Sequence, residues 1–125
     1  MKIVHSEATI DESIRLYRIL GFNIVKMTFP DGTKAMSIGF AGTLDQAMEE
    51  AQADFKEEFG IWCRMAPAAS LIGYGVMLQR DLDLRHEVPD DYDVQSDALI
   101  AVDRLPVVAA ALSERGIHLN WRAFA

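Results

Sequence analysis

The sequence predicts an α+β fold with a mostly antiparallel sheet and helices on one face. Two observations predict it. Stretches with apolar residues at helical spacing alternate with short apolar runs that are bounded by glycine and proline. In addition, the two ends of the chain share one order of strand, helix, glycine and strand, with Gly21 and Gly116 at matching places. We therefore expect a single α+β domain over residues 1–125, in which two β-α-β halves flank a central hairpin.

The first half is expected to contain a helix. Thr9 and Glu12 have the spacing of a capping box, and apolar residues recur at helical spacing over residues 10–20. Gly21 follows directly, where a helix end needs a left-handed residue. This pattern predicts a helix over residues 10–20.

A β-hairpin and a second helix follow. Residues 22–29 and 33–40 read as strands, and Pro30-Asp31-Gly32 supplies the turn between them. A second capping box, Thr43 with Gln46, opens a helix over residues 43–60.

The remaining elements depend on short apolar runs and breakers. Such runs favour strands when they are brief and flanked by glycine or proline, and an acidic, proline-bearing stretch favours an exposed connection. Pro106 suits the first turn of a helix, and Arg115-Gly116 suits its end. We expect strands at residues 61–65, 71–78, 98–102 and 117–124, a connection at 80–96, and a helix from residue 105.

Charge and composition exclude several classes of protein. The 125 residues carry a net charge of −7, which repels a phosphate backbone and argues against nucleic-acid binding. Cys63 is the single cysteine, so no internal disulfide can form, and a reducing compartment fits. Without a signal-type opening or a long uninterrupted apolar run, the sequence predicts a cytoplasmic protein with no membrane association.

The acidic residues gather in two segments, residues 45–58 and 81–97. A solvated helix face and a solvated loop are one explanation. The alternative is a surface that binds a basic protein partner, and the sequence leaves both open.

The segment ATIDESIRLYRILGF, residues 8–22, resembles the opening of proteins of the vicinal-oxygen-chelate superfamily, which includes glyoxalases, bleomycin-resistance proteins and extradiol dioxygenases. Those chains carry an acidic-Ser-x-x-aromatic-Tyr stretch that runs into Leu-Gly-Phe. Residues 76–79 are similar to the fourth strand of that family, and residues 98–119 to the start of its second β-α-β-β-β unit. The two halves thus suggest a ferredoxin-like or vicinal-oxygen-chelate-like arrangement.

The metal site of that family does not carry over. Its two histidine positions align with Lys2 and the neighbourhood of Asp97, and its carboxylate position aligns with Gln79. The resemblance therefore implies a shortened member without metal ligands, whose exposed sheet edge a partner subunit would cover. The three histidines of the chain lack metal-motif spacing, so we expect no metal and no cofactor.

No catalytic motif is present in the sequence, and Cys63 reads as a buried structural residue. The expected strand over residues 71–78 pairs Tyr74 with small residues, which suits close approach of a ligand or of a packed helix. The leading hypothesis is a non-catalytic domain that binds a small apolar ligand or serves as an accessory subunit, and that forms a homodimer. The second is an acidic protein-interaction module, and the third is a metal-independent enzyme. The expected ligand-binding residues are Trp62, Tyr74, Met77 and Gln79.

Overall fold

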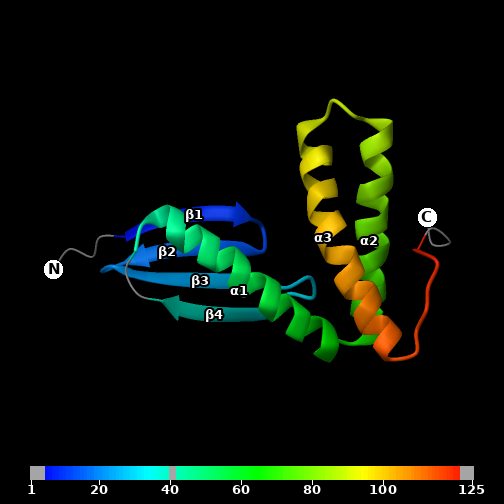
Figure 1. Ribbon diagram of the computed structural model, residues 1–125, viewed down its shortest axis with the longest axis horizontal. Coiled ribbons are helices and arrows are strands. Elements are labelled where there is room, and N and C mark those ends of the chain that lie inside the picture. The colour runs from blue at the N-terminus through cyan, green and yellow to red at the C-terminus, as the bar shows by residue number, and fades with distance from the viewer. Residues whose placement is uncertain (1–4, 40–41, 122–125) are drawn as a thin grey trace. The chain divides into compact units, whose positions relative to one another are not determined.

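A computed structural model describes residues 5–39 and 42–121, with four strands followed by three helices (Figure 1). The strands are β1 (His5–Asp11), β2 (Ile14–Ile19), β3 (Phe22–Thr28) and β4 (Lys34–Gly39). They form one antiparallel sheet in the order β1-β2-β3-β4, each paired with its neighbour in sequence. The expected α+β class with an antiparallel sheet is confirmed. The expected arrangement is wrong, because a four-stranded meander takes the place of two β-α-β halves.

The helices are α1 (Leu44–Met65), α2 (Ala68–Glu87) and α3 (Tyr92–Glu114). Contacts divide the chain into an N-terminal unit, residues 1–62, and a C-terminal unit, residues 63–125. The sheet and most of α1 make the first unit, and the α2–α3 hairpin makes the second. Each unit has its own core and is described by itself.

The expected helix over residues 10–20 is wrong, because these residues form the turn and strand of the β1–β2 hairpin. The Asp11 carboxylate accepts a hydrogen bond from the Ser13 backbone N–H at 2.6 Å and so fixes the turn. Ile14 and Leu16 then alternate into the core, a period of two that suits a strand. Gly21 does adopt the expected positive φ, +82°, but it lies in the tight turn between β2 and β3.

The predicted hairpin over residues 22–40 is confirmed over its described part; Phe40 lies outside the described residues. The register places Val25 opposite Ser37 and Ile24 opposite Ile38. Gly32, with φ +85°, closes the connecting turn, where its N–H donates to the carbonyl of Phe29 at 2.9 Å.

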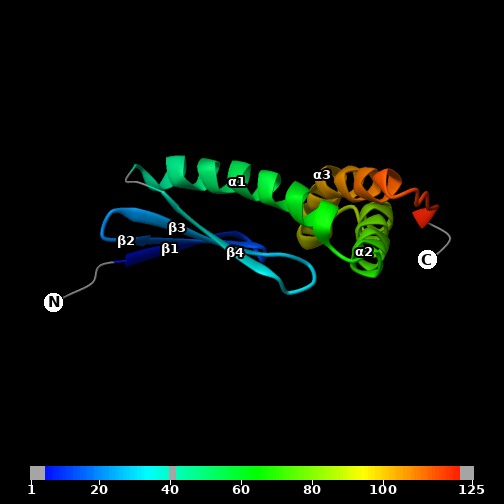
Figure 2. The ribbon, with the colours of Figure 1, turned by 90° about the horizontal axis from the view of Figure 1, so that it is seen from below.

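Helix α1 covers one face of the sheet, which we call the inner face (Figure 2). The predicted capping box is confirmed, because Thr43 N–H donates to Gln46 Oε1 at 3.0 Å and Gln46 N–H donates to Thr43 Oγ1 at 3.2 Å. The helix does not stop at Gly60 as expected. It continues to Met65, so the expected strand over residues 61–65 is wrong.

The core of the N-terminal unit lies between α1 and the inner face. Stacked rings connect the two layers: Phe29 from the turn after β3 lies 5.9 Å from Phe55 and 5.8 Å from Trp62, measured between ring centroids. The buried side chains are Ile14, Leu16, Val25, Met27, Phe29, Ala47, Ala51, Phe55, Phe59 and Trp62.

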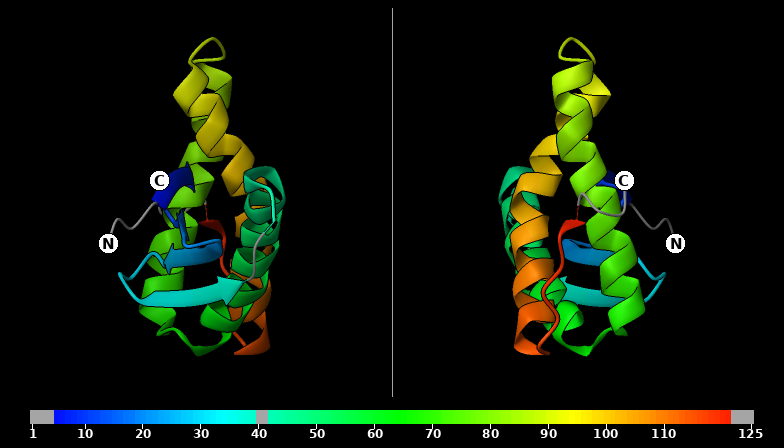
Figure 3. Two further views of the ribbon diagram at one scale, coloured as in Figure 1. Left: turned by 90° about the vertical axis from the view of Figure 1, so that its left-hand side faces the viewer. Right: turned by 90° about the vertical axis from the view of Figure 1, so that its right-hand side faces the viewer.

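Helices α2 and α3 run antiparallel and are joined by a short turn (Figure 3). The expected strands at residues 71–78 and 98–102, and the expected connection at 80–96, are therefore wrong. In α2 the buried residues recur at helical spacing, as Leu71, Tyr74, Gly75 and Leu78. Asp91 caps α3 by accepting a hydrogen bond from the Val94 backbone N–H at 3.0 Å.

Helix α3 is longer than expected, because it begins at Tyr92 and not near residue 105. Pro106 lies inside it, where it has no N–H for the carbonyl of Val102. The expected stop is confirmed: α3 ends at Glu114, and Gly116 follows with φ +78°. The expected strand at residues 117–124 is not found, since 117–120 are irregular and 122–124 lie outside the described residues.

Arg115 connects the two ends of the C-terminal unit. Its guanidinium donates hydrogen bonds to the backbone carbonyls of Cys63, at 2.7 Å, and Ala66, at 2.6 Å. These carbonyls belong to the end of α1 and the residue after it, where helix carbonyls lack intrahelical partners. A cation at this place also opposes the negative end of the helix dipole.

Candidate functional site

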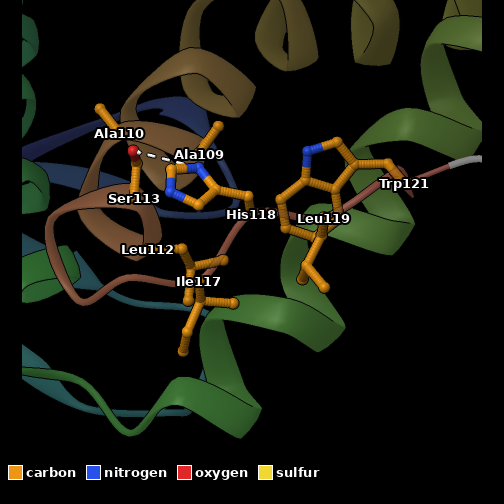
Figure 4. A pocket seen from close by; sticks show the side chains of 8 residues that line it. All are labelled: Ala109, Ala110, Leu112, Ser113, Ile117, His118, Leu119 and Trp121. Atoms are coloured by element: carbon orange, nitrogen blue, oxygen red, sulfur yellow. Dashed lines mark hydrogen bonds between the residues drawn. The ribbon is translucent and has the colours of Figure 1, made fainter.

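A groove of about 360 Å³ lies in the C-terminal unit, between the end of α3 and the segment that follows it (Figure 4). The segment leaves α3 at Gly116, whose left-handed conformation turns the chain back along the helix. Ile117 N–H donates to the Leu112 carbonyl at 2.9 Å and fixes this return. The side chains that characterise the groove are Leu112, Ser113, Ile117, His118, Leu119 and Trp121.

Trp121 closes the groove because α2 has a glycine beneath it. A Cβ at Gly75 would overlap the Trp121 ring carbons Cη2 and Cζ3 and would lie 3.0 Å from Cε3. Gly75 is thus needed for the indole to lie against α2. Gly73 lies two residues before Gly75, and a Cβ at Gly73 would meet nothing within 4 Å. The expected role of small residues in close approach is therefore found at Gly75, on a helix.

The polar edge of the groove consists of Ser113 and His118. Ser113 Oγ lies 3.4 Å from His118 Nδ1, and both side chains are exposed to solvent (Figure 4). A hydroxyl and an imidazole offer a ligand both donor and acceptor groups. The distance is longer than the roughly 2.6–3.2 Å typical of a nucleophile and its base. This geometry suits recognition of a polar group better than nucleophilic catalysis.

Trp62, the first expected site residue, belongs to the N-terminal unit. It is buried, and its indole N–H donates to Asp31 Oδ2 at 3.2 Å. Hydrogen bonds from Thr33, followed by the one from Trp62, hold the pKa of Asp31 below its ordinary value. Trp62 therefore anchors the β3–β4 turn to α1.

The other three expected residues lie on α2 in the C-terminal unit. Tyr74 is buried, and its hydroxyl accepts a hydrogen bond from Arg104 Nη1 at 3.0 Å. Met77 is 48 % exposed, and Gln79 Nε2 donates to Asp83 Oδ1 at 3.1 Å. None of the four residues is among those that line the groove of Figure 4.

Cys63 is buried, as expected, and lies near the end of α1. Burial raises the pKa of its thiol to about 11, against a smaller lowering effect of the nearby Arg115 charge. Because the thiolate is the reactive form, this cysteine is poorly suited to nucleophilic chemistry.

Within the described residues, no three His, Cys, Asp or Glu side chains gather as a metal site requires. Of the positions aligned with metal ligands, Lys2 lies outside the described residues, while Gln79 and Asp97 lie on α2 and α3. His118 lies in the segment after α3, and His5 lies in β1. Over residues 5–39 and 42–121, no helix has the length and apolar character that crossing a bilayer requires.

Comparison of the chain with known protein families, curated proteins and solved structures finds no match. The resemblance to the vicinal-oxygen-chelate superfamily therefore stays a prediction. The segments that suggested it, residues 8–22, 76–79 and 98–119, form a β-hairpin, part of α2, and α3 with the start of the following segment.

Sequence reasoning missed Trp121 and Ser113 as groove residues. The only local signal was Gly116 after a helical stretch, which indicates that the chain turns back. The contact between Gly75 and Trp121 depends on packing between residues distant in the sequence, and no local pattern encodes it.

Proposed function

We propose that this chain is a non-catalytic domain that binds a small, largely apolar ligand in the groove of the C-terminal unit. The observation that carries the proposal is the indole of Trp121, which packs against Gly75 and lines the groove together with Leu112, Ile117 and Leu119. A flat aromatic ring and aliphatic side chains favour planar apolar molecules, and a volume of about 360 Å³ is within the usual range for small-molecule sites.

The polar edge defines the second property of the ligand. Ser113 and His118 expose polar atoms among the apolar side chains that line the groove, so a ligand with a single carboxylate, sulfonate or hydroxyl group fits both kinds of lining. A few polar groups in an apolar pocket fix the orientation of a ligand. The proposed class is therefore a planar apolar molecule with one polar or anionic end.

Titration with 1-anilinonaphthalene-8-sulfonate, a planar apolar anion, tests the proposal. We expect saturable binding of one probe per chain. Leu119→Asp should weaken binding by about tenfold or more because it places a charge in the apolar wall. His118→Ala should weaken binding less. His86→Ala is the matched control, because His86 is an exposed histidine of α2 that does not line the groove.

Equal affinity in wild type and Leu119→Asp would contradict the proposal. Circular dichroism of each variant verifies that it folds. If Ile38→Glu on β4 abolishes the fluorescence while Leu119→Asp does not, the probe binds the sheet and the groove is not the site.

A second candidate function is recognition of a basic protein by α1. Asp45, Glu49, Glu50 and Glu57 are all exposed on this helix, and Lys56 is the exposed cation among them. Such a surface would bind a lysine-rich peptide in a manner that weakens with salt. Titration with oligolysine, comparing wild type with Glu49→Lys/Glu50→Lys, tests this candidate. Equal affinity of the two proteins would exclude it.

A further inference from the structure

The sheet of the N-terminal unit carries apolar side chains on both faces. α1 covers the inner face, and on the opposite face, the outer face, Met36 is 67 % and Ile38 69 % exposed. The register aligns Tyr17, Ile24 and Ile38 in one row across β2, β3 and β4. An antiparallel sheet with one solvated face normally alternates apolar and polar side chains. An apolar outer face is therefore unusual for a surface that stays in water.

The charged groups of the outer face are mostly basic. Arg15 and Lys26 are paired in register with Met36, and Lys34 follows on β4. Glu7 is the acidic neighbour, 3.9 Å from Arg15. A hydrogen bond to Tyr17 is the main cause, and the charge of Glu7 a further one, of the raised pKa of Arg15. The complementary partner is apolar and acidic.

Helix α3 carries a surface of that kind. Tyr92 is 83 % and Leu99 70 % exposed, and the exposed Val102 and Pro106 continue the row at helical spacing. We call these four residues the α3 stripe. Asp103 is exposed beside it. The stripe lies opposite to the side of α3 that packs on α2, where Ala98, Ala101 and Leu105 are buried.

The size of the two surfaces suits an interface. A fully covered aromatic side chain buries roughly 150–250 Å², and the smaller Met and Ile side chains bury about 150 Å². At the exposures of Met36, Ile38 and Phe22, these three side chains together offer about 300 Å² of apolar surface. This area is at the lower end of the roughly 300–600 Å² of the largest patch on a typical monomer, and it can form the centre of a standard interface of about 800 Å² per partner.

We propose that the outer face of the sheet in one copy binds the α3 stripe of a second copy. The two surfaces lie on separate units of the chain, and in a symmetric dimer each copy would supply both of them. The basic residues Arg15 and Lys26 then face Asp103 of the other copy, and the apolar rows meet between them. This inference goes beyond the ligand groove and does not depend on it.

Sedimentation equilibrium at 150 mM salt, where the overall negative charge is screened beyond about 8 Å, tests the dimer. We expect wild type to reach twice its 13.9 kDa mass at micromolar concentration. Ile38→Glu and Leu99→Glu, which lie on separate units, should each raise the dissociation constant by more than about tenfold. Gln52→Glu, on the exposed side of α1, is the matched control and should leave it unchanged.

A charge exchange tests the pairing itself. Lys26→Glu and Asp103→Lys should each be weaker dimers than wild type, because each places like charges together. Their mixture should form a heterodimer of near wild-type affinity, because both contacts then join opposite charges.

A wild-type monomer at 100 μM would overturn the proposal. A dimer that Ile38→Glu disrupts but Leu99→Glu does not would also overturn it, because the sheet would then pair with a surface other than the α3 stripe.

Discussion

The contact between Gly75 and Trp121 can be tested by comparing the same substitution at two glycines of α2, Gly73 and Gly75. Replacing Gly by Ala inside an exposed helix gains about 1 kcal/mol from helix propensity. At Gly73 a methyl group meets nothing within 4 Å, so Gly73→Ala should stabilise the C-terminal unit by that amount. At Gly75 the same methyl overlaps the Trp121 ring, so the ring must shift away from α2.

The cost of expelling Trp121 follows from its burial. The side chain is mostly but not fully buried, and a contact with α2 that covers about half of the roughly 150–250 Å² of a buried aromatic side chain returns about 100 Å² of apolar surface to water when it is lost. At about 25 cal/mol per Å² this loses about 2.5 kcal/mol. Gly75→Ala should therefore destabilise the protein by about 1.5 kcal/mol after its gain in propensity.

Urea unfolding followed by circular dichroism measures both variants. Acrylamide quenching, in a Trp62→Phe background, reports the exposure of Trp121 alone. Gly75→Ala should increase the quenching, and Gly73→Ala should not. If both variants stabilise the protein equally and leave the quenching unchanged, Trp121 does not pack on α2, and the groove loses its wall.

The remaining predictions concern Tyr74, Arg115, Cys63 and metal removal. Tyr74→Phe should lower the free energy of unfolding in urea by about 1 kcal/mol, because Arg104 loses an acceptor. Tyr74→Ala should lower it by about 3 to 5 kcal/mol, because it also leaves a cavity. A loss under about 1 kcal/mol for Tyr74→Ala would return Tyr74 to the ligand-binding residues. Arg115→Met should lower the free energy of unfolding by about 2 kcal/mol, because the carbonyls of Cys63 and Ala66 lose their charged donor. An unchanged urea midpoint would show that these hydrogen bonds do not stabilise the protein. The Cys63 thiol ionises near pH 9.0 when unfolded and near pH 11 when folded, so stability should fall as pH rises between these values; Cys63→Ala should reduce this fall, and identical pH profiles would exclude the assignment. Treatment with EDTA should leave the melting temperature unchanged, and a fall of several degrees that one divalent metal reverses would establish a metal site.

Local chemistry predicted the parts of the fold that short segments determine. The Thr43–Gln46 capping box, the turn at Gly32 and the end of α3 before Gly116 depend on backbone conformation within a few residues. The sequence predicted these three features, and the structure confirms them. The α+β class is confirmed as well, although the β1–β4 meander replaces the two β-α-β halves from which it was predicted.

The errors occurred where two periods fit the same residues. Ile14 and Leu16 fit the spacing of a helix when they are taken with the apolar residues before them, and the spacing of a strand when they are taken together. The pairing of β2 with β3 stabilises the strand. Leu71, Tyr74 and Leu78 fit both a short strand and a helix face, and packing against α3 decides for the helix. Two glycines in this segment suggested a strand with a bare face, but one of them accommodates Trp121.

The expected site residues failed to gather for the same reason. Trp62, Tyr74, Met77 and Gln79 were grouped as neighbours on adjoining strands. In helices, Trp62 and Tyr74 point into separate cores, and the groove is lined by a segment that no motif marks.

The hydrogen bonds from Arg115 to Cys63 and Ala66 have a consequence for the order of events on the ribosome. The N-terminal unit is complete once residue 62 has left the exit tunnel, and its meander pairs only strands that follow one another. It can therefore fold while the rest of the chain is still being made. The C-terminal unit must wait for residue 115, because its first carbonyls are held by a side chain near its last helix end. Until then, the apolar sides of α2 and α3 are covered only by each other.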